Sequence, residues 1–207
     1  MSEQITYRLR VVYAKTGRLA MLSHLELIRA LERIVRRSNL PYAISCGFSP
    51  HMKISFGSAL PVGVGGAKEE FDVFLLKRID EAAAFEALSA SAPGDIRIKA
   101  AFYVYKSLPA VSNAHEASVY EAVFDREINP NEFLIPETVY LEKKKETKER
   151  RVADYLIDPP SIEKNTVTFR LKNRQDGSLR PDAFVKACLD ASRLDVEIRT
   201  ITRIAYE

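Results

Sequence analysis

The side chains best able to do chemistry lie in one stretch of this sequence, residues 17–63. Two of the three histidines, His24 and His51, occur there, and Lys53 follows a Gly-Phe-Ser-Pro-His cluster. Imidazole exchanges protons near neutral pH, and a lysine is a positive point charge. The stretch therefore favours two kinds of chemistry, which are proton transfer and anion binding.

A helix is predicted over residues 24–38, within this stretch. Ser23 followed by Glu26 has the spacing of a capping box, and Asn39 to Pro41 end the helix. One side of the helix is apolar, with Leu27, Ile28, Leu31, Ile34 and Val35. The other side is basic, with Arg29, Arg33, Arg36 and Arg37.

Two interpretations of the basic side stay open. It is a solvated face partly paired with Glu26 and Glu32, or it is a positive stripe that binds phosphates. The second interpretation rests on the planar guanidinium group, which donates two hydrogen bonds to one phosphate. The predicted anion-binding or RNA-binding residues are then Arg29, Arg33, Arg36, Arg37 and Lys53.

The loop after this helix also has two interpretations. It is a bulged β-edge with an exposed His51, or it closes a pocket against the start of the helix. Free N–H groups at a helix N-terminus attract an anion, which is the reason for the pocket. Its predicted residues are Ser23, His24, Gly47, Phe48, Ser49 and His51. The Phe48 ring is expected either to stack on a base or to belong to the core.

Catalysis and metal binding have less support in the sequence. His24 and His51 are the candidate catalytic residues, but serines adjacent in sequence do not make a nucleophile–base pair. The cysteines, Cys46 and Cys188, are far apart and show no zinc or iron–sulfur spacing. We therefore expect no metal site and no cofactor bound by this chain.

The hydrophobic pattern predicts an α+β fold of two tandem ferredoxin-like (βαββαβ) modules. Residues 1–106 form the first, with strands at 5–14, 53–56, 70–76 and 96–105 and helices at 24–38 and 80–90. A linker is placed at 107–116, and residues 117–207 form a looser second module. That module has strands at 117–124, 138–143, 152–157, 166–172 and 196–206, a helical turn at 129–132 and a helix at 181–190.

Charge is unevenly distributed between the two halves. Residues 1–106 hold 15 Lys and Arg against 10 Asp and Glu, a net +5, whereas residues 107–207 hold 16 against 18, a net −2. The first half is the one expected to face an anionic partner. The first residues show no apolar segment of signal-peptide length, and no apolar run is long enough to span a membrane, so we expect a cytoplasmic protein.

Residues 17–72 resemble the radical SAM-linked proteins, a bacterial family of unknown function. The shared positions are Gly17, Ser23, His24, Leu25, Arg29, Arg33, Arg36, Arg37, Leu40, Pro41, Ser45, Gly47, Phe48, Pro50, His51, Ser55, Phe56, Leu60, Pro61, Gly63 and Asp72. The departures are Glu26, Ser49 and Met52. Arg180-Pro181-Asp182 matches a second pattern near the end of the family.

The resemblance implies a partner rather than a reaction. Such proteins look like companions of radical SAM enzymes in RNA modification or translation, so tRNA or rRNA is a possible ligand. The partner would carry the iron–sulfur cluster and SAM, because this chain lacks the three-cysteine motif. We expect an accessory RNA-binding or substrate-presenting protein. The alternatives are an RNA-cleaving or RNA-modifying enzyme that uses His24 or His51, and a protein-interaction scaffold.

Overall fold

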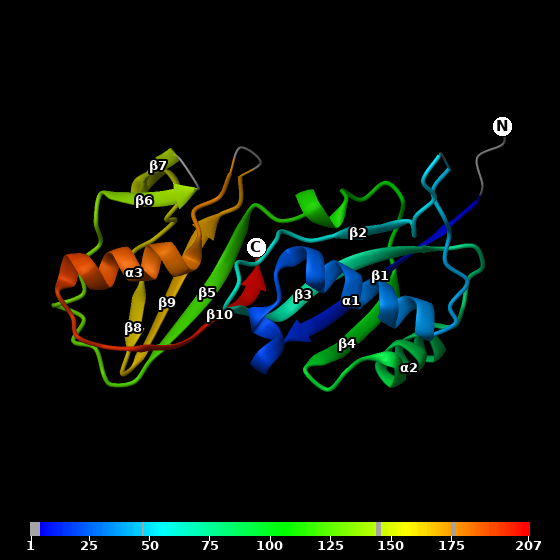
Figure 1. Ribbon diagram of the computed structural model, residues 1–207, viewed down its shortest axis with the longest axis horizontal. Coiled ribbons are helices and arrows are strands. Elements are labelled where there is room, and N and C mark those ends of the chain that lie inside the picture. The colour runs from blue at the N-terminus through cyan, green and yellow to red at the C-terminus, as the bar shows by residue number, and fades with distance from the viewer. Residues whose placement is uncertain (1–4, 47, 144–145, 175–176) are drawn as a thin grey trace. The chain divides into compact units, whose positions relative to one another are not determined.

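The computed structural model describes residues 5–46, 48–143, 146–174 and 177–207 (Figure 1). The chain divides into two compact units, Met1–Val62 with Gly66–Ala114 (unit 1) and Gly63–Gly65 with His115–Glu207 (unit 2). It is a mixed α/β fold with three α-helices in the described ranges. In the same ranges, no helix combines the length and apolar character that crossing a bilayer requires.

Unit 1 has the element order that the sequence predicts. Its helices are α1 (His24–Arg37) and α2 (Glu81–Ser91), with short 3-10 turns at Gly17–Met21 and Val111–Asn113. Its strands are β1 (Tyr7–Lys15), β2 (Ile54–Phe56), β3 (Val64–Leu75) and β4 (Ile96–Tyr103). They follow the order β4-β1-β3-β2, and every pair is antiparallel.

The core of unit 1 lies between this sheet and both helices (Figure 1). Alternate residues of the strands face it, because successive side chains of a strand point to opposite faces. Leu9 and Val11 of β1 and Phe71 and Val73 of β3 are fully buried there. The helices contribute Leu27, Leu31, Ile34, Val35, Ala84 and Leu88. Each large apolar side chain buried in this way stabilises the fold by about 1.5–3 kcal/mol.

On the opposite face of the same sheet, ion pairs between strands β1 and β3 take the place of apolar packing. Asp72 of β3 is completely buried and lies beside Arg10 of β1 in the register. Its carboxylate accepts hydrogen bonds from Arg8 Nε at 2.7 Å and from Arg10 Nε at 2.8 Å. Arg8 also donates to the carbonyl oxygens of Leu108 and Pro109, at 2.8 and 2.6 Å. Residues 108–109 therefore bind to unit 1 through Arg8. The division into modules at 1–106 and 117–207 with a linker at 107–116 stays a prediction.

Unit 2 is built on a sheet of four antiparallel strands. β5 (Ala117–Phe124) lies between β10 (Ile198–Tyr206) and β9 (Thr166–Lys172), and β8 (Ser161–Glu163) pairs with β9. The helix α3 (Pro181–Ser192) packs on this sheet, with the Phe184 and Phe169 ring centroids 4.9 Å apart. A separate hairpin joins β6 (Thr138–Lys143) to β7 (Glu146–Arg151).

Two predictions for the second half need correction. Residues 152–157 do not form a strand: Val152–Asp154 is a 3-10 turn, because Val152 and Tyr155 are both buried and such a turn puts residues three apart on one side. The charged run before it forms β7 instead. α3 is also the only α-helix among the described residues of unit 2, so two tandem ferredoxin-like modules are not confirmed.

Asp72→Asn tests the charge cluster on this sheet. The change leaves the buried Arg8 guanidinium without its carboxylate and takes one of two carboxylate partners from the half-buried Arg10. We therefore expect a loss of about 3–5 kcal/mol in the free energy of unfolding. Urea unfolding of the full chain measures it. The control is Asp182→Asn, which breaks the exposed pair with Arg180 and should cost less than about 1 kcal/mol. Equal effects of the two changes would contradict the role given to Asp72.

Candidate functional site

The start of α1 is closed by its own capping box, as the sequence predicts. The Glu26 backbone N–H donates to Ser23 Oγ at 3.4 Å, and the Ser23 backbone N–H donates to Glu26 Oε2 at 2.9 Å. Hydrogen bonds from Ser23 and the charge of Arg29 lower the pKa of the Glu26 carboxyl. The N-terminus of a helix attracts anions, and here the carboxylate of Glu26 provides that negative charge from within the protein.

His24 lies in the first turn of α1, beside a cavity of about 10 Å³, which has room for roughly one water molecule. Its ring meets Phe56 edge-on, with centroids 6.3 Å apart. The remaining walls are Tyr13, Leu27, Ile28, Gly57, Ser58, Leu60, Glu69 and Glu70. His24 Nδ1 is buried and has no hydrogen-bond partner among the residues that the structure describes.

Two buried charged residues near this cavity are ones that the sequence reasoning missed. Lys15 and Glu69 are only 1% and 3% exposed, and Lys15 Nζ donates to the Leu22 carbonyl at 3.2 Å. Burial, with the positive charge of Lys15, lowers the pKa of His24, so its imidazole is neutral at neutral pH. Strand alternation could have identified Lys15, which is in phase with the buried positions of β1.

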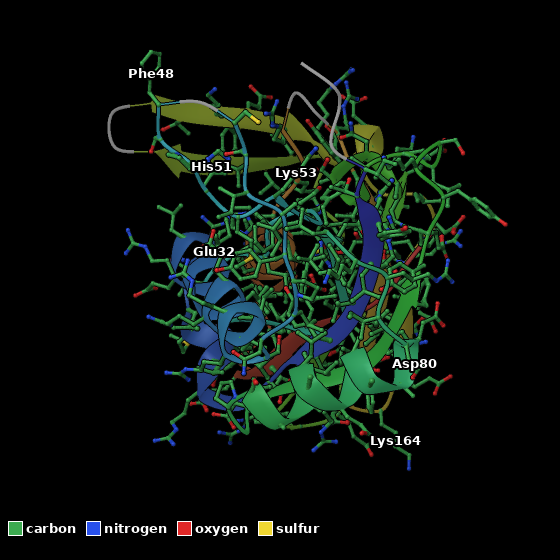
Figure 2. The ribbon with its side chains drawn as sticks, turned by 90° about the vertical axis from the view of Figure 1, so that its right-hand side faces the viewer. Glu32, Phe48, His51, Lys53, Asp80 and Lys164 are labelled. Atoms are coloured by element: carbon green, nitrogen blue, oxygen red, sulfur yellow. The ribbon has the colours of Figure 1, made fainter. Side chains whose placement is uncertain are left out.

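His51 lies elsewhere, in the hairpin that follows α1 (Figure 2). Its Nδ1 is 3.0 Å from Ser45 Oγ and 3.1 Å from the Ser49 carbonyl oxygen. Its backbone N–H also donates to Ser45 Oγ, at 3.1 Å. These contacts hold the ring through Nδ1, so Nε2 is the ring nitrogen on the side away from Ser45 and Ser49.

The structure does not bring the two predicted histidines into one pocket. No described residue between 45 and 53 lines the cavity beside His24; Phe56 of β2 and the two residues after it do so instead. Ser23 is occupied in the cap, and Phe48 and Ser49 are exposed. Gly47 lies outside the described residues. What the structure places together at His24 is Phe56, Glu69 and Glu70, from β2 and β3.

The arginines of α1 lie on its solvent side, as predicted. Arg29, Arg33, Arg36 and Arg37 are all exposed, because burial of the apolar side turns them outward. In the parts of the chain that the structure describes, none of the four has a carboxylate within ion-pair distance. Lys53 is exposed too, with its Nζ 5.2 Å from the centre of the Phe74 ring. The four arginines form what we call the basic surface. Lys53 does not belong to it, because it alternates with Met52 and Ile54 of the core and lies over Phe74 on the other face of the sheet.

The two cysteines differ in their chemical state. Cys46 is exposed on the hairpin, whereas Cys188 is buried in α3. Burial raises the pKa of the Cys188 thiol to about 12, so it stays protonated and unreactive at neutral pH. In the described ranges no three His, Cys, Asp or Glu side chains gather as metal ligands would.

The lowered pKa of His24 predicts how stability depends on pH. The unfolded chain, whose histidine pKa is about 6.5, takes up a proton before the folded protein does. The stabilising contribution of neutral His24 is complete above about pH 6.5 and is lost as the pH falls below it. His24→Phe should make urea unfolding less sensitive to acid than that of the wild type, because this imidazole is then no longer present to take up a proton on unfolding. An unchanged acid slope in His24→Phe would contradict this assignment.

Comparison with known proteins places the sequence motifs in a family. No significant match exists among curated proteins. One similar solved structure is the "Crystal Structure of an Unknown Protein from Galdieria sulphuraria", with 11% identity over 97% of this chain and 100% of that chain. Its TM-score is 0.26, so it carries no argument about fold. Residues 8–181 match the model of a family described as "Uncharacterized protein conserved in bacteria (DUF2344)". The chain belongs to this family of uncharacterized proteins conserved in bacteria.

Proposed function

We propose that this protein is an accessory RNA-binding or substrate-presenting protein. It works with a separate radical SAM enzyme, in RNA modification or translation-related processing. The basic surface supports the RNA-binding part of the proposal. The radical SAM part is supported by the motif resemblance of residues 17–72 described under Sequence analysis.

The observation that carries the proposal is a surplus of unpaired positive charge. From Arg33 to Lys68 the sequence has five Lys or Arg and no Asp or Glu. This stretch includes the second half of α1, the hairpin and β2. Surface cations of globular domains are usually interspersed with carboxylates. Within this stretch a polyanion meets little competition from the protein's own acids, whereas Arg29 lies close to Glu26.

The chemistry of the basic surface suits phosphates. Arg29, Arg33 and Arg37 recur every fourth residue, so their guanidinium groups follow one side of α1. A row of such groups can neutralise successive phosphates along a strand, and each can donate two hydrogen bonds. The expected binding depends on charge and is therefore sensitive to salt.

A division of labour with a radical SAM enzyme follows from the cysteines. Such an enzyme holds its cluster with three nearby cysteines, whereas this chain has two, 142 positions apart (188 minus 46). In the proposal the partner supplies the cluster and SAM, and this protein supplies the RNA. The residues of this chain then bind and orient the substrate instead of transferring atoms to it.

A second candidate function is RNA cleavage or modification by His51. The observation that favours it is the fixed ring, held at Nδ1 by Ser45 and Ser49 with Nε2 on the side away from them. When Nδ1 carries the proton, Nε2 has a lone pair and can act as a general base. His24 is a weaker candidate, because its Nδ1 is buried against protein. A catalytic His51 would shorten or alter RNA during the binding experiment below, and His51→Ala would stop the change.

The RNA-binding proposal is tested by charge reversal on α1. Arg33→Glu with Arg37→Glu should weaken binding of a labelled stem-loop RNA by at least about tenfold at low salt and flatten the salt dependence. Fluorescence anisotropy measures both. The matched control is Arg97→Glu with Lys99→Glu, which makes the same charge change at exposed positions of β4 and should have a much smaller effect. If both double variants lost the same affinity for RNA, the effect would come from net charge and not from the position of the arginines. If the wild type bound no RNA at low salt, the protein-interaction scaffold would be the favoured function.

The partner proposal is tested by capture from bacterial cytosol. The tagged full-length protein should retain both RNA and a protein with the three-cysteine radical SAM motif, identified by mass spectrometry. Ribonuclease treatment before the capture shows whether the enzyme binds the protein directly: an enzyme held only through RNA is lost, and an enzyme in direct contact with the protein is retained. Recovery of RNA in repeated captures without any such enzyme would remove the radical SAM partner from the proposal and leave the RNA-binding part.

A further inference from the structure

The hairpin after α1 has a firmly held stem. Ala43 accepts a backbone hydrogen bond from Lys53 at 2.8 Å, and Ser45 donates to His51 at 2.8 Å. Between them Ile44 and Met52 form a β-bridge, and Ala43 and Met52 are buried in unit 1. These contacts anchor the stem of the hairpin to unit 1.

Phe48 at this tip is the most exposed large apolar side chain of the described residues. Its ring is 112% exposed, whereas Phe71 is fully buried and Phe102 is 37% exposed. Figure 2 shows it at the outer end of the hairpin, directed away from unit 1, with His51 and Lys53 closer to the body. A fully exposed ring forgoes the stabilisation of burial, and contact with a partner can recover it.

The surroundings of Phe48 indicate what kind of partner this is. Arg36 and Arg37 lie in the last turn of α1, just before the hairpin, and Lys53 lies at the base of its stem. No acidic residue occurs in the sequence between Glu32 and Glu69. An exposed aromatic ring close in sequence to positive charges favours a ligand that is both aromatic and negatively charged, because such a ligand can stack on the ring and pair with the charges. A nucleotide has both properties, with a base that stacks and a phosphate that pairs.

We propose that Phe48 stacks on an unpaired base of the RNA, while the neighbouring cations hold its phosphates. The inference rests on the proposed RNA-binding function and narrows its substrate to single-stranded or loop RNA. Bases inside a duplex already stack on one another and do not offer a face to a side chain. His51, in the same hairpin, lies close enough along the chain to contact the same nucleotide.

Binding of three probes by Phe48→Ala tests the proposal. For an unstructured RNA of roughly 16 nucleotides we expect a 10- to 100-fold loss of affinity, the usual effect of removing one stacking aromatic. For the duplex of that RNA, and for an abasic strand of equal length, we expect no change, because neither presents an unpaired base. Phe48→Tyr should retain affinity for the single strand and Phe48→Leu should not, since only the first keeps an aromatic face. Phe48 is exposed, so all three variants should unfold like the wild type.

Stacking can also be observed directly, because the chain contains no tryptophan. Phe48→Trp places a single indole at the tip, and we expect the single-stranded RNA to quench its fluorescence and the abasic strand to leave it unchanged. Tyr105→Trp is the control, at a residue 82% exposed outside the hairpin, and should show much weaker quenching.

The possible outcomes separate this inference from the proposed function. RNA binding that needs Arg33 and Arg37 but is the same in Phe48→Ala, with no quenching in Phe48→Trp, would overturn the stacking role and leave the RNA-binding function intact. Equal losses for single strand, duplex and abasic strand would also overturn it. A loss confined to the single strand, accompanied by quenching, supports it. Absence of binding to any of the probes would overturn both.

Discussion

The buried carboxylate of Asp72 is the interaction on which the arrangement of unit 1 depends. It accepts hydrogen bonds from Arg8 and Arg10, and Glu70 lies 3.5 Å from Arg10, so two positive and two negative charges balance at the sheet. Isolated charges would be very costly there, and the pairing makes their burial tolerable. Because Arg8 also binds the carbonyls of residues 108–109, that face of the sheet is covered by the chain itself. The other face remains for the helices.

The helix α1 connects this fold to the proposed function. Burial of Leu27, Leu31 and Val35 fixes the rotation of the helix about its axis, and this rotation directs the arginines to solvent. The capping box fixes where the helix begins. The basic surface is therefore a consequence of core packing, and it needs no loop to change conformation before it can meet a polyanion. The hairpin that follows α1 in the chain adds an exposed aromatic side chain, and backbone hydrogen bonds hold the stem of this hairpin.

Local patterns in the sequence were sufficient to predict a helix or strand when one of its faces is buried and the other is exposed to solvent. The capping box, the cap of α2 at Asp80 and the strands of unit 1 follow from patterns a few residues long. Such patterns fail where the local signal is ambiguous. Residues 152–157 are apolar enough for a strand, yet they turn, and the charged residues before them pair with β6. Which residues form the strand was decided by pairing with β6, and the β-propensity of single residues does not predict such a pairing.

The sequence by itself determined the family, the course of α1 and the outward direction of its arginines, because periodicity and capping act within a few residues. Tertiary structure alone decided that Phe56 of β2 and Glu69 and Glu70 of β3, and not His51, line the cavity beside His24, because strand pairing brings them there. It also decided that Lys15 and Glu69 are buried beside His24 and that Asp72 lies between two arginines. These contacts join residues up to 64 positions apart, so their electrostatics depend on strand pairing rather than on any local pattern.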